Sequence, residues 1–88
     1  MNLIHLTNTT PQIINYHGGE GIVAIWGTFG GANITVEVSF DGTTYMSLKD
    51  VSNDTVSANN NEMWNIKVRN CKIKATASGN TNVYVGIM

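Results

Sequence analysis

The chain has 88 residues and a mass of 9.5 kDa; 42% of its residues are hydrophobic and only 12% are charged. A chain of this length is expected to form one domain, residues 1–88, with a small core. Its net charge is −1 and its pI is about 6.0, so it has no positive field that would draw it onto nucleic acid or an anionic membrane. We therefore expect neither as a partner.

The first ten residues lack a basic segment followed by a long apolar core, and the longest apolar run is Ile22–Trp26. Neither an export signal nor a membrane span is therefore predicted, and we expect a chain that is made in the cytoplasm and not secreted. Cys71 is the only cysteine, which excludes an internal disulfide. It alternates with Ile73 and Ala75, so a buried packing thiol is favoured over a reactive one.

Short apolar or alternating segments recur about every 8–12 residues, separated by Gly, Asn, Asp and Thr, which is typical of a sandwich or barrel. No helical period of useful length is present. The fold class predicted is all-β, an antiparallel β-sandwich of Ig-like or jelly-roll-like type with about seven to nine short strands and no substantial helix. The predicted strands are Leu3–Thr7, Gln12–Asn15, Gly21–Gly27, Asn33–Phe40, Thr44–Leu48, Thr55–Ala58 (the weakest), Met63–Arg69, Cys71–Ser78 and Asn82–Ile87.

Asp41-Gly42 lies between two alternating segments, and a two-residue Asp-Gly turn predicts a tight β-hairpin. Such a corner would put Val38 and Tyr45 on the same side of the hairpin. Alternation in the first segment predicts one buried face, made of Ile34, Val36, Val38 and Phe40.

The aromatic residues fall into two groups by position. Trp26 and Trp64 occupy apolar strand positions and are predicted to be core anchors. Tyr84 and Phe29 are less well explained by the core. Phe29 lies in a Gly-rich loop and is the aromatic that we expect first to contact a partner.

Four basic residues occupy positions that are expected to face outward on two consecutive predicted strands: Lys67, Arg69, Lys72 and Lys74. A tight turn at Arg69-Asn70 would place Lys67 directly opposite Lys72. Like charges so placed cost about 0.2–1 kcal/mol unless an acidic group lies between them, and Glu37 or an acidic partner surface could be that group. The candidate partner contact is therefore Phe29, Lys67, Arg69, Lys72 and Lys74, with a solvated face as the alternative for the four cations.

No set of residues in the sequence predicts a metal site, a cofactor site or a catalytic site. His5 and His17 are far apart and lack two further ligands at short spacing, so no metal site is predicted. The glycine segments lead into strands, whereas a phosphate-binding loop leads into a helix, so no cofactor is predicted. No nucleophile, base and orienting group can be assembled from this sequence. We expect no catalytic residue and a protein that is not an enzyme.

Two stretches carry a resemblance to a known group of proteins. The first runs from Trp26 to Tyr45 and contains Gly-Thr-Phe-Gly-Gly-Ala and then Ser-Phe-Asp-Gly; Leu48 follows it. The second is Cys71-Lys-Ile-Lys-Ala-Thr-Ala-Ser-Gly79, which leads into Asn82-Val-Tyr-Val. In this order, from Gly21 to the C-terminus, the chain resembles the small β-sandwich proteins encoded among the virion structural genes of tailed bacteriophages. It departs from them at Tyr45, where Trp is common, and in its Asn-rich loop.

The resemblance implies a non-enzymatic virion component, made in the host cytoplasm, that often decorates or cements the outside of the capsid. The implied partner is the major capsid protein or another virion protein, and a homo-oligomer is also possible. The alternative is a carbohydrate-binding or host-adhesion module of a phage tail or fibre, in which aromatic rings stack on sugars. The resemblance assigns no functional residue in this sequence.

Overall fold

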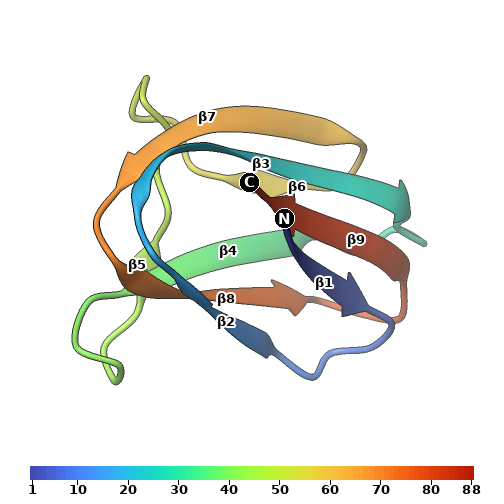
Figure 1. Ribbon diagram of the computed structural model, residues 1–88. Coiled ribbons are helices and arrows are strands. Elements are labelled where there is room, and N and C mark those ends of the chain that lie inside the picture. Colours follow the sequence, from blue (N-terminus) through green and yellow to red (C-terminus); the bar gives the residue numbers. More distant parts are fainter.

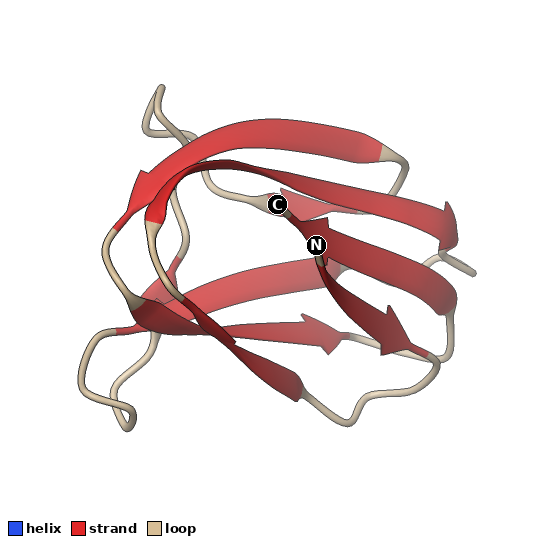
Figure 2. Cartoon of the chain, in the orientation of Figure 1, coloured by secondary structure: helices blue, strands red, loops and turns tan.

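Nine strands and no helix make up the chain in the computed structural model, which describes all 88 residues (Figures 1 and 2). Two antiparallel sheets pack together, which confirms the predicted antiparallel β-sandwich. Each predicted segment contains a strand, although the fifth and the sixth are only two residues long. The strands are β1 (Asn2–Leu6), β2 (Gln12–Tyr16), β3 (Gly19–Thr28), β4 (Ile34–Ser39), β5 (Met46–Ser47), β6 (Ser57–Ala58), β7 (Glu62–Val68), β8 (Cys71–Ala77) and β9 (Asn82–Ile87).

The first sheet has the order β1-β9-β3-β7, and the second has the order β2-β8-β4. Two short strands complete the second sheet by pairing with β4, β5 near its end and β6 at its start. Most connections therefore cross from one sheet to the other, as Figure 1 shows for β1 to β2 and for β7 to β8. The predicted tight hairpin at Arg69-Asn70 is wrong for this reason: β7 pairs with β3, whereas β8 pairs with β2 and β4.

The core lies between the sheets and contains 21 clustered buried residues. Strict alternation builds it: in β8, the buried positions are Cys71, Ile73, Ala75 and Ala77. Each fully buried aliphatic side chain contributes about 1.5–3 kcal/mol through its removal from water. Trp64 is 8% exposed and belongs to this core, as predicted.

Trp26 does not belong to the core, so that prediction is wrong. The buried residues of its strand are Val23 and Ile25. Trp26 points to the opposite side of the strand, as Ile22 and Ala24 do. The run Ile22–Trp26 is apolar on both faces of β3, and such a run does not reveal which face is inward. Trp26 is half-buried on the outer face of the first sheet.

The Asp41-Gly42 corner is a wider loop than predicted. Val38 pairs with Met46, so six residues, 40–45, connect β4 to β5. Directly paired residues share a face, which puts Tyr45 on the side opposite Val38 and corrects the expectation that they lie together. The Tyr45 ring lies instead 4.2 Å from the Lys74 Nζ on the outer face of the second sheet.

Candidate functional site

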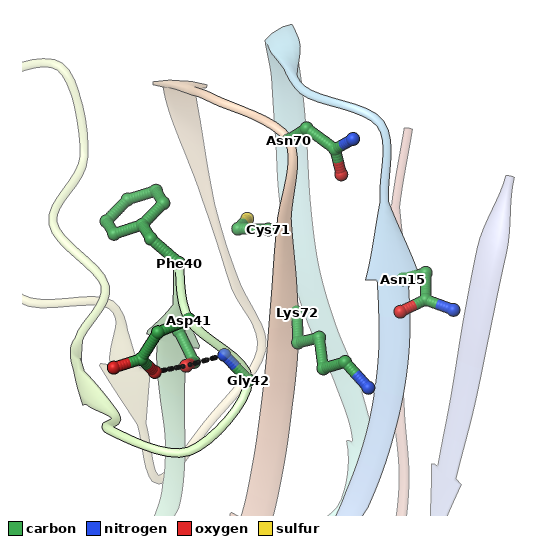
Figure 3. Close-up of a pocket in the computed structure, with 8 residues that line it drawn as sticks. Asn15, Phe40, Asp41, Gly42, Asn70, Cys71 and Lys72 are labelled. Atoms are coloured by element: carbon green, nitrogen blue, oxygen red, sulfur yellow. Dashed lines mark hydrogen bonds between the residues drawn. The ribbon is translucent and has the colours of Figure 1, made fainter.

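Phe40 is the one aromatic side chain that is more than half exposed, although its parity predicts burial. It follows the end of β4 and lines a surface cleft of about 650 Å³ together with Lys67, Val68, Arg69 and Asn70. We call this set the Phe40 cleft. A second pocket of about 370 Å³ adjoins it, and Figure 3 shows Asn15, Asp41 and Lys72 among its lining residues.

Hydrogen bonds order the loop around Phe40. The buried Ser39 hydroxyl donates to Asp41 Oδ1 at 2.9 Å and accepts the Gly42 N–H at 2.9 Å (Figure 3). Asp41 Oδ1 also accepts the N–H groups of Thr43 and Thr44, each at 2.8 Å. These bonds order the backbone on both sides of Phe40, whose side chain is 54% exposed.

The same bonds affect the Asp41 carboxyl. The N–H groups of Thr44 and Thr43 and the Ser39 hydroxyl hold the pKa of this carboxyl well below its usual value of 3.8. The folded chain therefore binds fewer protons at this site than the unfolded chain does. The stability that Asp41 contributes is complete above about pH 5 and is lost as the pH falls through the folded pKa.

We predict that Asp41→Asn reduces the acid sensitivity of the protein, because an amide oxygen can accept the same bonds without titrating. Urea unfolding followed between pH 7 and acid pH provides the measurement. The wild-type midpoint should fall more steeply below about pH 4 than that of the variant. Identical pH profiles for the two proteins would show that Asp41 does not carry this dependence.

The structure divides the four predicted cations. Lys67 lies on β7 with its Nζ 4.0 Å from Glu20, and Lys74 lies on β8 with its Nζ 3.7 Å from Glu37. Glu37 thus pairs with Lys74, and not with Lys67 and Lys72, between which the sequence suggested that it could lie. Lys67 and Lys72 belong to different sheets and do not oppose one another.

Arg69 lies in the cleft and Lys72 in the adjoining pocket, and neither has an acidic partner within 4.0 Å. This end of the sandwich thus holds three cations, Lys67 being the third, together with the carboxylates of Asp41 and Glu20. Lys74 lies apart from it, next to Tyr45.

Phe29, the aromatic that we expected to contact a partner, is 8% exposed and packs in the core. The chain turns back at Gly30 and Gly31, which have φ values of 59° and 81°, and the Ala32 N–H donates to the Phe29 carbonyl at 2.9 Å. Positive φ at both central residues is the type I′ geometry. The structure thus offers Phe40, and not Phe29, at the surface.

The outer face of the first sheet is a second candidate surface, and sequence reasoning missed it. Register places Leu3, Gly86, Ala24 and Met63 in one row across β1, β9, β3 and β7. A neighbouring row contains Met1, Met88, Ile22 and Asn65, and a third contains His5, Tyr84 and Trp26. We call these eleven residues the outer face. The unbroken apolar run of β3 is the sequence feature that could have predicted this face, because it places apolar residues at outward positions as well as inward ones.

The aromatic row is closely stacked. The rings of His5 and Tyr84 are 4.3 Å apart and 9° from parallel, and those of Tyr84 and Trp26 are 5.7 Å apart at 23°. The Trp26 ring also covers Gly86, where an added Cβ would lie about 3.0 Å from it. Both faces of the Tyr84 ring are thereby occupied, so Tyr84 has no free face for a sugar.

The remaining reactive groups do not cluster. Burial raises the pKa of the Cys71 thiol, and this side chain is 6% exposed, as expected of a packing residue. No three potential metal-ligating side chains lie together. No helix is long and apolar enough to cross a membrane.

The chain is a small two-sheet β-sandwich, with the Phe40 cleft at one end and the outer face on the first sheet. No protein-family model and no curated protein matches the chain. The SPBc2 prophage-derived protein YomS, a solved structure, is similar over 99% of this chain and 92% of its own, with a TM-score of 0.63 and 14% identity. That likeness shows a shared fold.

TmCBM61, solved in complex with β-1,4-galactotriose, is similar over 97% of this chain and 63% of its own, with a TM-score of 0.41 and 20% identity. That TM-score is too low to support an argument about this chain.

Proposed function

We propose that this chain is a non-enzymatic structural protein of a phage virion that decorates the outside of the capsid. Its partner is the major capsid protein, and the Phe40 cleft makes the contact. The observation that carries the proposal is the exposure of Phe40, 54%, beside Arg69, a cation that has no acidic partner. The fold shared with a prophage-derived protein supports a phage origin.

The cleft has the composition of a binding hot spot. Aromatic residues and Arg are enriched among the few residues that dominate interface energies, and both are present here as Phe40 and Arg69. The loop bonds of Asp41 order Phe40 before binding, which lowers the entropy cost of association. The cations favour an acidic rim around an apolar socket on the partner. Many copies on one particle would add avidity to a modest single contact.

The direct test is to sediment labelled protein with purified capsids that lack it, across a salt series. We expect a fixed ratio of bound copies to capsid subunits, with affinity that falls as salt rises because cleft cations take part. No sedimentation with capsids would overturn the proposal. Binding to tail fibres or to host glycans in the same assay would then favour the adhesion alternative.

Phe40→Ala should weaken capsid binding about 30-fold, which corresponds to a hot-spot loss of about 2 kcal/mol. Val51→Ala is the matched control, because Val51 is 62% exposed and lies outside the cleft. Affinities from the sedimentation assay check the prediction. Equal affinities for both variants would exclude Phe40 from the contact.

A further inference from the structure

The outer face holds an unusual share of the exposed apolar side chains. The chain has four methionines, all more than half exposed, and three of them lie on this face: Met1 (76%), Met63 (68%) and Met88 (53%). Leu3, in the same row as Met63, is 51% exposed. With the half-buried Trp26 and its neighbours, they leave roughly 500 Å² of apolar surface, near the upper limit of the largest patches on monomeric proteins.

No Asp, Glu, Lys or Arg side chain lies among the three rows. Polar groups occur at the sides, where His5 Nε2 lies 2.6 Å from Asn82 Oδ1 and Asn65 ends one row. The charges of the second row are the Met1 amino group and the Met88 carboxylate, and the nearest charged side chains are Glu20 and Lys67, which pair with each other beyond the Asn65 row. Met and aromatic residues are enriched, and charged residues depleted, in the cores of protein interfaces. The face therefore has the composition of an interface core with a polar rim.

We propose that the outer face binds a second copy of this chain, in a two-fold symmetric dimer with sheet packed on sheet. A mainly apolar face without charged Asp, Glu, Lys or Arg side chains is complementary to itself, whereas a charged partner fits the Phe40 cleft better. Homodimer interfaces are the more apolar class. Including its polar rim, the face offers roughly 800 Å² per copy, which is what each partner contributes to an interface of standard size.

The packing geometry suits this pairing. Two sheet faces stack about 10 Å apart when their side chains interdigitate. The side chains of Trp26 and Met1 lie close to Gly86, and the flexible side chains of Met63 and Met88 can fill gaps between two such faces. Because Phe40 lies at the sandwich end and outside this face, each dimer would carry two available clefts.

Methionine oxidation on the isolated protein tests the dimer without any capsid, so its outcome is separate from that of the capsid assay. Dilute hydrogen peroxide is applied across a range of protein concentrations, and sulfoxide at each methionine is read by mass spectrometry. Met46 is the internal control, since it is 54% exposed but lies on β5 in the other sheet. We expect severalfold protection of Met63 and Met88 at high concentration and constant oxidation of Met46. Concentration-independent oxidation of all four would overturn the proposal.

Sedimentation equilibrium measures the same association by mass. The wild type should approach twice the 9.5 kDa of one chain at micromolar concentration, and a double variant, Leu3→Lys with Met63→Lys, should remain at the monomer mass. Ile13→Lys is the control and should dimerise like the wild type, because Ile13 is 53% exposed but lies on β2 of the other sheet. A wild type that stays at the monomer mass, or a double variant that still dimerises, would contradict the proposal.

Discussion

Ile73→Ala is expected to remove about 2–5 kcal/mol of unfolding free energy. Ile73 is 0% exposed at the middle of β8, where it pairs with Ile14 on one side and Val38 on the other. The loss combines the lost transfer free energy with the cost of a cavity that packed neighbours cannot fill. A domain of this size is stabilised by only about 4–13 kcal/mol, so the variant should lose a large share of its stability.

Urea unfolding followed by tryptophan fluorescence gives the measurement for Ile73→Ala. Ile13→Ala is the matched control, since Ile13 is an isoleucine on β2 of the same sheet but is 53% exposed. Its loss should stay within about 0.5 kcal/mol, as for surface substitutions in general. Similar losses for both variants would mean that the core does not close around Ile73.

Gly27→Ala should be the second large effect, at about 3 kcal/mol or more, because it combines a strained backbone with a collision. Gly27 has a φ of 133°, which side chains other than hydrogen rarely tolerate. A Cβ there would also collide with the Asn82 carbonyl oxygen and lie 3.0 Å from the Val83 Cα, both on the paired strand β9. Backbone atoms cannot move aside as a flexible side chain can, so the β3–β9 ladder itself must shift.

Gly19→Ala separates the two costs. Gly19 lies in the same strand with a φ of 103°, but an added Cβ would meet nothing within 4 Å. Its variant should lose only the backbone contribution, about 1–2 kcal/mol. Thermal unfolding of both variants beside the wild type measures the difference. Equal losses would show that the close approach of β9 to Gly27 has no energetic consequence.

The two surfaces have separate roles in the proposed function: the Phe40 cleft would bind the capsid, and the outer face would bind a second copy of the chain. The Phe40 cleft joins an apolar anchor to the unpaired cation Arg69, which favours a partner of opposite charge. The outer face is mainly apolar and has no Asp, Glu, Lys or Arg side chain, which favours a second copy. A dimer would present two clefts at once, and linked contacts bind more tightly than either alone when geometry permits both.

The local alternation of apolar and polar residues predicted the positions of the strands well. Alternation in residues 71–77 predicted β8 and its buried positions, and even the weak segment 55–58 contains β6. The reason is that side-chain direction in a strand has a period of two, which any half-buried strand records in its own sequence. The burial of Trp64 and Cys71 followed from the same rule.

Pairing between strands was not predicted in the same way. Adjacent segments such as β7 and β8 were expected to form a hairpin, but they belong to different sheets. The candidate contact changed accordingly: Lys67 and Arg69 meet Phe40, Lys74 binds Glu37, and Phe29 is in the core. No local pattern says which sheet a strand joins, because that choice depends on contacts between residues far apart in the chain.

The sequence by itself determined an all-β sandwich, the positions of its strands and most of the inward residues, since these depend on local alternation and turn residues. Only the tertiary structure decided which face of β3 is inward, that Phe40 is exposed beside the hydrogen-bonded Ser39 and Asp41, and that eleven residues from four strands form one apolar outer face. These features arise when strands pair in register and loops close over strand ends, and both steps join residues that are separated along the chain.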